Sequence, residues 1–209
     1  MKRDLLGMND LRAEEIISII ESAQKFKQNR GRIGKELEGK SIALIFEKPS
    51  TRTRVSFEVG IKELGGESLF LSSQELQLAR GETIADTART LSRYVHGIVA
   101  RVKAHDSLVE LARHSTIPVI NALSQIEHPC QTLADLLTIK EHKSKLKGVK
   151  VAWVGDGNNV CNSLALGCAL VGANLSIACP KGYEPPDEIM EKARKNASSA
   201  GCEISITND

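Results

Sequence analysis

The chain has 209 residues, of which 41% are hydrophobic and 26% are charged, which is typical of a soluble globular protein with one or two domains. Its formal net charge of +2 and its aromatic content of 3% argue against nucleic acid or a membrane surface as a general partner. The sequence has neither an 18-residue apolar span nor an apolar leader after its first residues, so we expect a cytoplasmic protein.

The five cysteines predict free thiols rather than a metal site or a disulfide framework. They form no CxxC pair and do not cluster with histidine, as zinc ligands do. Their odd number and apolar neighbours are typical of thiols in a reducing compartment. We therefore expect no bound metal.

Apolar periodicity predicts strands and helices that alternate along the chain. Asn9-Asp10 would cap a first amphipathic helix, and Ser50 would cap a helix that Gly65-Gly66 ends. Strands are predicted at 41–46, 68–71, 97–102, 117–121, 149–154, 174–179 and 203–207, with further helices at 82–94, 107–114, 129–141, 159–171 and up to about 197. This alternation predicts an α/β fold with a mostly parallel sheet and helices on both faces.

A charged stretch at 140–147 predicts a domain boundary, with one domain at 1–143 and a second at 144–209. The second region has only about sixty residues, close to the lower limit for an independent hydrophobic core. It also ends on a predicted strand. We therefore expect an incomplete second domain from a longer enzyme.

The segment "FEKPSTRTR" at 46–54 is the first candidate site. Arg52 and Arg54 fall in the opening turn of a predicted helix, where the helix dipole is already positive. A bound anion would resolve this conflict, and strand ends in open α/β sheets are common ligand sites. The alternative is that the arginines are solvated or pair with Glu47 and Glu58.

An anion at this turn would find several donors. The helix offers free backbone N–H groups, and Arg52 offers a planar fork that fits phosphate oxygens. Three hydroxyl groups are also available, from Ser50, Thr51 and Thr53. We interpret the turn as a phosphate site.

A second cluster, "HPCQ" at 128–131, begins another predicted helix. His128 and Gln131 have the spacing to face one ligand, and they are able to bind a carbonyl oxygen and an NH₂ group. Taken alone, His128 also fits a structural or capping role, and Cys130 fits packing better than nucleophilic attack. Arg101 ends a predicted strand, and Gln77 in a loop carries almost no signal of its own.

Together, "STRTR" at 50–54 and "HPCQ" at 128–131 strongly resemble the carbamoyltransferase family. The preceding "FEK" and the segment "WVGDGNNV" at 153–160 are similar to its ornithine-specific members. The resemblance covers essentially the whole chain. It implies a two-domain carbamoyltransferase-like fold, a homotrimer or multiple of trimers, and carbamoyl transfer from carbamoyl phosphate to L-ornithine, giving L-citrulline and phosphate without a metal or cofactor.

The resemblance also implies residue roles, with Arg52, Arg101 and His128 as the catalytic set. The turn would hold the phosphate, and the second cluster with Arg101 would bind the carbamoyl end. Gln77 matches a position that reaches the neighbouring subunit's site, and Asn159 one that contacts ornithine. The residues implied in substrate binding are Ser50, Thr51, Arg52, Thr53, Gln77, Arg101, His128, Pro129, Cys130, Gln131 and Asn159.

Three alternatives stay open. Another carbamoyltransferase, using aspartate or a different amine, would share the phosphate domain, and a non-catalytic phosphate-binding module would retain only the anion site. The remaining ornithine signatures of the family, an Asp with Ser-Met-Gly and a His-Cys-Leu-Pro loop, are absent, so the chain could bind carbamoyl phosphate without turnover.

A dinucleotide site is disfavoured because Val160 replaces the third glycine of G-x-G-x-x-G. Whether the reaction serves arginine biosynthesis or catabolism is not indicated.

Overall fold

The computed structural model describes residues 2–31 and 34–209, which form two compact units. Unit 1 contains residues 2–6 and Gln28–Gln125, and unit 2 contains Gly7–Lys27 and Ile126–Asp209. The amino-terminal segment therefore contributes to both units. Within the described residues, no helix combines the length and apolar character needed to cross a bilayer.

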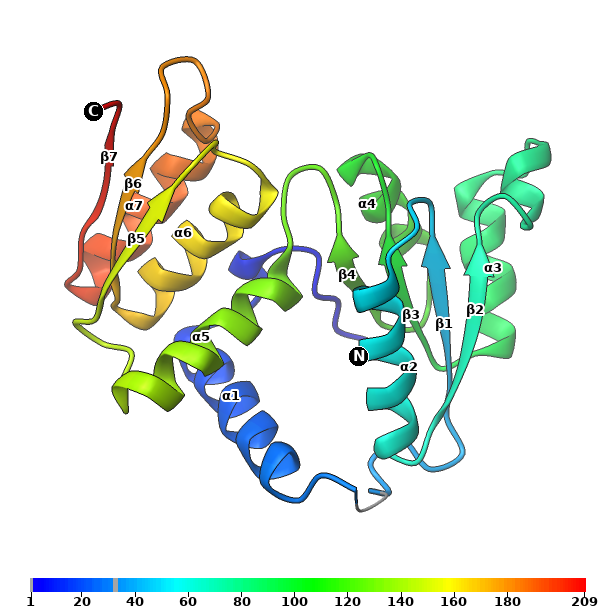
Figure 1. Ribbon diagram of the computed structural model, residues 1–209. Coiled ribbons are helices and arrows are strands. Elements are labelled where there is room, and N and C mark those ends of the chain that lie inside the picture. Colours follow the sequence, from blue (N-terminus) through cyan, green and yellow to red (C-terminus); the bar gives the residue numbers. More distant parts are fainter. Residues whose placement is uncertain (1, 32–33) are drawn as a thin grey trace. The chain divides into compact units, whose positions relative to one another are not determined.

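Unit 1 is built on a four-stranded parallel sheet with the strand order β2-β1-β3-β4 (Figure 1). Its strands are β1 (Ser41–Phe46), β2 (Glu67–Ser72), β3 (Gly97–Arg101) and β4 (Val119–Leu123). The connecting helices are α2 (Thr51–Glu63), the short 3₁₀ helix η2 (Gln77–Arg80), α3 (Ile84–Tyr94) and α4 (His105–His114).

Helices cover both faces of this sheet because side chains alternate along the strands. Ala43 and Ile45 of β1 face a cluster that includes residues of α3 and α4. Leu44 and Phe46 face the opposite cluster, to which α2 contributes Ile61. The buried strands β1 and β3 are apolar on both faces, as expected for the centre of a parallel sheet.

Unit 2 is built on a three-stranded parallel sheet with the order β5-β6-β7. Its elements are η1 (Met8–Asp10), α1 (Ala13–Gln28), α5 (Pro129–Lys143), β5 (Lys150–Val154), α6 (Asn159–Val171), β6 (Asn174–Ala178), α7 (Asp187–Ala200) and β7 (Ile204–Thr207). Helix α6 is buried along most of its length, between α5 and α7 (Figure 1). Ala152, Val154 and Ser176 are exposed on one face of the sheet.

The predicted α/β fold with mostly parallel strands is confirmed, and every predicted strand is present within two residues of its expected bounds. Ser50 caps α2 as predicted. The predicted cap at Asn9-Asp10 is wrong, because these residues lie in η1 and α1 begins only at Ala13. The Asp10 carboxylate accepts from the Gly7 N–H, and Glu15 accepts from the Arg12 N–H at the start of α1.

Candidate functional site

The turn after β1 presents two linked hydroxyl groups at the start of α2. Ser50 is the N-cap residue, and its Oγ accepts a hydrogen bond from the Thr53 backbone N–H at 3.3 Å. The same hydroxyl donates to Thr53 Oγ1 at 2.9 Å. The cap therefore fixes both hydroxyl groups beside the backbone N–H groups of the first helical turn.

Arg101 reaches this turn from the end of β3, the strand that pairs with β1. Its Nη1 donates to Thr53 Oγ1 at 3.4 Å, and its carbonyl oxygen accepts from the Glu47 N–H at 2.9 Å. Thr53 Oγ1 thus accepts from both Ser50 and Arg101, which directs its own proton away from them. That proton is available to an oxygen of a ligand.

The Arg101 guanidinium is partly withdrawn from solvent. Burial lowers the pKa of Arg101, and the positive charge of Arg52 lowers it further. Its Nε is buried and, among the residues that the structure describes, finds no hydrogen-bond partner. Two cations and a helix N-terminus therefore converge on the turn, although the Arg52 side chain itself is exposed. An anion bound there would offset both the charge repulsion and the lost solvation.

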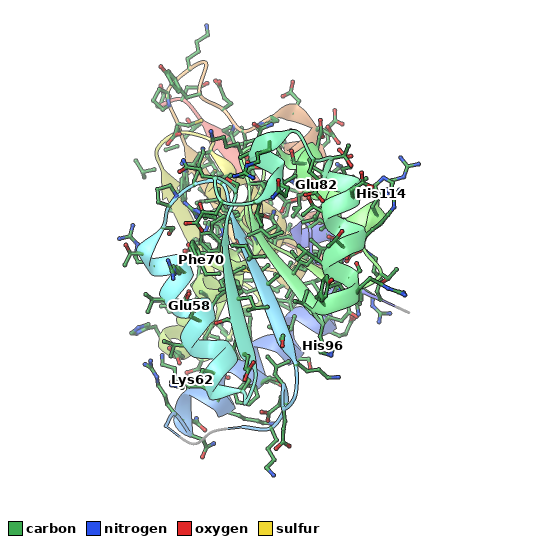
Figure 2. The ribbon with its side chains drawn as sticks, turned by 90° about the vertical axis from the view of Figure 1, so that its right-hand side faces the viewer. Glu58, Lys62, Phe70, Glu82, His96 and His114 are labelled. Atoms are coloured by element: carbon green, nitrogen blue, oxygen red, sulfur yellow. The ribbon has the colours of Figure 1, made fainter. Side chains whose placement is uncertain are left out.

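Arg54 forms an ion pair within α2, as in the alternative interpretation that the arginines pair with neighbouring glutamates. Its Nε lies 2.9 Å from Glu58 Oε1, one helical turn further along α2. Its guanidinium also stacks over the Phe70 ring, with Cζ 3.6 Å from the ring centroid. Figure 2 shows Glu58 and Phe70 on neighbouring parts of α2 and β2. Arg54 therefore joins α2 to β2, and only Arg52 is left to face an anion.

Gln77 begins η2, a short helix that the sequence did not predict, and its side chain is exposed. The neighbouring residues Leu78 and Ala79 line a hollow of about 490 Å³ at the same end of the sheet. Glu47 and Lys103 also line it, and Glu47 Oε2 accepts from the Lys103 N–H at 2.6 Å. Glu47 is thus engaged with the backbone rather than with either arginine of the turn.

The residues of the second cluster belong to unit 2, at the start of α5. His128 is the N-cap residue, and its backbone N–H donates to Ser163 Oγ at 2.8 Å. Gln131 is exposed and donates from Nε2 to Asp135 Oδ1 at 2.9 Å. These residues share one helix start, as their spacing predicts.

Pro129 is buried at the first position of α5, and Cys130 follows it as a half-buried thiol. Burial raises the pKa of Cys130 to about 12, so the group stays protonated near neutral pH. A protonated thiol is a poor nucleophile, in agreement with the interpretation from the sequence. Within the described residues, no three His, Cys, Asp or Glu side chains are grouped as metal ligands.

Asn159 begins α6 in unit 2, directly after the N-cap residue Asn158. The Asn158 side chain accepts from the N–H groups of Val160 and Cys161, at 2.9 and 3.2 Å. Gly157 precedes the cap, and its N–H donates to the Tyr183 carbonyl oxygen at 2.7 Å. The capping role of Asn158 has a sequence signal, since asparagine before an apolar helix is a favoured cap.

Sequence reasoning missed the side chains that hold His128. Glu127 is 8% exposed, and its Oε2 accepts from the Met8 N–H and from Ser163 Oγ, both at 2.9 Å. Met8 and Ser163 are far from Glu127 in the sequence, so neither spacing nor composition could have indicated their contact. Only the adjacency of Glu127 to the "HPCQ" segment was visible.

Comparison with known proteins identifies relatives over the whole chain. The model of the aspartate/ornithine carbamoyltransferase carbamoyl-P binding domain matches residues 3–141, and that of the Asp/Orn binding domain matches residues 147–209. Ornithine carbamoyltransferases from Methanosarcina mazei and Methanosarcina acetivorans are 56% and 54% identical, over 100% of this chain and 68% of each relative. The solved ornithine carbamoyltransferase of Pyrococcus furiosus is 53% identical, with a TM-score of 0.96 over 99% of this chain and 67% of that structure. The chain thus spans about two thirds of the length of these relatives.

Proposed function

The chain belongs to the aspartate/ornithine carbamoyltransferase family, and we propose that it transfers the carbamoyl group of carbamoyl phosphate to the δ-amine of L-ornithine. The products are L-citrulline and phosphate. The identity to ornithine carbamoyltransferases, at more than half of all aligned positions, favours ornithine over aspartate as the acceptor.

The observation that carries this proposal is the anion cradle of unit 1. The Ser50 and Thr53 hydroxyl groups are fixed at the start of α2, and Arg101 donates to Thr53 from β3. Arg52 adds a second cation close enough to lower the pKa of Arg101. A helix N-terminus with hydroxyl and guanidinium donors suits a phosphate group better than any neutral ligand.

We assign the phosphate to the residues from Ser50 to Thr53 and the carbamoyl end to the cluster at 128–131 together with Arg101. Arg52, Arg101 and His128 are the catalytic set, with Gln131, Pro129 and Cys130 completing the carbamoyl-binding segment. Asn159 contacts ornithine, and the exposed Gln77 extends to the site of a neighbouring subunit. Residues 1–143 form the carbamoyl-phosphate-binding domain and residues 144–209 contribute to the ornithine-binding domain, in keeping with the family-model matches.

The chemistry needs positioning and charge stabilisation rather than a covalent intermediate. The neutral δ-amine attacks the carbamoyl carbon, and negative charge gathers on the carbonyl oxygen. The donors Thr53, Arg101 and His128 stabilise that oxygen, as preorganised donors do in other acyl transfers. The bond from carbon to the phosphate oxygen then breaks, phosphate leaves toward Arg52 and the helix N-terminus, and the amine releases its proton.

The assembly we propose is a homotrimer or a multiple of trimers. Exposed apolar side chains occur on the edge strand β2 and on the helix packed against it, at Leu69, Val55 and Val59, which are 47%, 50% and 38% exposed. Figure 2 looks onto the β2 edge of the sheet, with α2 and its residues Glu58 and Lys62 on the left. An exposed edge strand with apolar neighbours is a common contact surface between subunits.

We place the enzyme in the cytoplasm. All five cysteines are free thiols, and three of them are buried in unit 2. Free thiols persist in reducing compartments, where structural disulfides are rare.

Calorimetry with carbamoyl phosphate, followed by an ornithine-dependent citrulline assay, tests the proposed function. Binding of carbamoyl phosphate and citrulline formation are the expected results. Failure to bind carbamoyl phosphate or phosphate would contradict the assignment. Binding without citrulline would favour the second candidate, a phosphate-binding module without turnover, and turnover with aspartate alone would move the acceptor to that amino acid.

A further inference from the structure

The carboxyl group of Glu127 is the one ionisable side chain among the buried polar residues that the structure describes. Burial raises its pKa, against the lowering effect of its hydrogen bonds with Met8 and Ser163. Burying a carboxyl group lowers stability unless its hydrogen bonds offset the lost solvation. Glu127 directly precedes His128, the residue assigned to the carbamoyl group.

The Ser163 hydroxyl connects these two residues. It lies on α6, is fully buried, and donates its single proton to Glu127 Oε2 at 2.9 Å. Its oxygen accepts the His128 backbone N–H at 2.8 Å. Because a hydroxyl has only one proton, the carboxylate that takes it leaves a lone pair for the amide. Glu127 thus sets the direction in which Ser163 accepts.

Two further contacts hold the backbone at residues 126–128. Asn162 Nδ2 donates to the Ile126 carbonyl oxygen at 2.9 Å, so adjacent residues of α6 hold the chain on both sides of Glu127. The carboxyl group is closed in from the other side by Gly7, where an added Cβ would lie 2.3 Å from Glu127 Oε1. The backbone entering α5 is therefore held by α6 and by the segment before η1, all within unit 2.

We propose that Ser163 and Glu127 are positioning residues for His128. Together they fix its backbone N–H and so the direction from which the imidazole meets the carbamoyl group. This inference rests on the proposed function. It adds that α6, which lies in the region matched by the Asp/Orn binding domain model, orients His128, a residue assigned to carbamoyl phosphate.

A positioning role predicts a loss of affinity for carbamoyl phosphate but not for inorganic phosphate. Inorganic phosphate carries only the part of the ligand assigned to Ser50–Thr53, whereas carbamoyl phosphate also carries the group assigned to the cluster at 128–131 and Arg101. A displaced His128 should therefore weaken carbamoyl phosphate and leave inorganic phosphate unaffected. The ratio of the two dissociation constants reports on the carbamoyl contacts, and of these only the His128 segment is bonded to Ser163.

The test is calorimetry of both ligands on the full chain and on its variants Ser163→Ala and Glu127→Gln. In Ser163→Ala, we expect affinity for carbamoyl phosphate to fall about tenfold, the scale of one unsatisfied buried donor, with inorganic phosphate unchanged. Glu127→Gln keeps an acceptor oxygen for Ser163 and should retain most of the wild-type ratio. Amide hydrogen exchange at His128 should accelerate in Ser163→Ala.

Thr132→Val is the matched control. Thr132 is a fully buried hydroxyl residue on α5 whose Oγ1 has no hydrogen-bond partner among the described residues. Its replacement removes a hydroxyl near His128 without touching the His128 N–H, so the ratio should not change. Thermal unfolding of each variant checks folding. If Ser163→Ala unfolds, Glu127→Ala keeps the test decisive, because it removes the acceptor that orients Ser163 and should lower the same ratio and accelerate exchange at His128.

The outcomes separate the inference from the proposed function. A wild-type chain that fails to prefer carbamoyl phosphate over inorganic phosphate overturns both. A wild-type preference that survives in folded Ser163→Ala, or an equal loss for both ligands, overturns the positioning role and leaves the proposed function standing. Accelerated exchange at His128 in a folded Ser163 or Glu127 variant that keeps the wild-type ratio also overturns it.

Discussion

Arg101 Nη1, at the end of β3, donates to Thr53 Oγ1 at 3.4 Å. Thr53 lies in the first turn of α2, the helix that follows the neighbouring strand β1. Because Thr53 also accepts from Ser50, one hydroxyl links the helix cap to a partly desolvated guanidinium. This three-residue link requires β1 and β3 to be adjacent and in register.

Arg52→Gln should change ligand affinity and stability in opposite directions. Phosphate affinity should fall by about ten- to a hundredfold, since a charge-assisted contact is lost. The unliganded protein should gain a few tenths of a kcal/mol, because an exposed charge that opposes Arg101 is removed. Calorimetry and urea unfolding measure the two effects, and a loss of stability without loss of affinity would argue for a structural role.

Arg54→Gln is the matched comparison from the same helical turn. It removes the ion pair with Glu58 and the contact over Phe70, so stability should fall by about 1 kcal/mol. Phosphate affinity should stay within about twofold of wild type. A large loss of affinity in this variant would place Arg54 in the anion site and contradict the division of roles between the two arginines.

Ser50→Ala should lower both stability and phosphate affinity. Loss of the cap costs about 1 kcal/mol, and the freed Thr53 hydroxyl no longer holds its direction. Thr83→Ala is the control, because Thr83 caps α3 in the same way and accepts from the Asp86 N–H at 3.0 Å. The two variants should unfold at similar urea concentrations, whereas only Ser50→Ala should bind phosphate weakly, by about tenfold.

The Glu127 carboxyl group predicts a pH dependence of stability. Burial raises its pKa in the folded chain above the ordinary value of 4.5. Below pH 4.5 both folded and unfolded states are protonated, so no penalty exists there. As pH rises from 4.5 toward the raised pKa, the unfolded state loses its proton while the folded state keeps it, so folding is progressively disfavoured, and the loss levels off above the raised pKa. Glu127→Gln removes this titration, so its stability relative to wild type should increase with pH.

Urea unfolding at a series of pH values from acidic to neutral measures this difference. A stability difference that is constant with pH would show that the group titrates alike in both states. Ser163→Ala removes one of the hydrogen bonds that lower the Glu127 pKa, so it should extend the decline to higher pH.

Leu69→Lys tests the proposed trimer. A charge on the edge strand should disfavour pairing between subunits, so the mass measured by sedimentation equilibrium should fall from three times the chain mass of 22.7 kDa to one. Val109→Lys places the same charge on α4, at a valine that is 44% exposed, and should leave the mass unchanged. Equal masses for both variants and the wild type would remove this surface from the contact.

Local patterns in the sequence were enough to predict β1 and the start of α2. A short apolar run gave the strand its exact bounds, and serine after proline indicated the cap. The same reasoning failed at Asn9-Asp10, since two good capping residues there formed a 3₁₀ turn instead. A cap signal states that a helix can begin, whereas packing decides whether it does.

The candidate site divides in the same way. The Ser50–Thr53 hydroxyl cluster was predictable because its members are three residues apart. The different fates of Arg52 and Arg54 were not, because Phe70 lies on another strand. The Glu127–Ser163 contact joins residues 36 apart in sequence, and only the folded chain brings them together.

The tight approach at Gly157 has a consequence for how this protein varies and can be engineered. A Cβ at that position would lie 2.1 Å from the Pro185 nitrogen, so the turn that carries Asn159 leaves no space for even a methyl group. The "DGNN" turn and residues 183–185 therefore fit together only while position 157 has no side chain, and any larger residue there requires the backbone at 184–185 to move. A graft that transplants the asparagines into another scaffold must carry both loops.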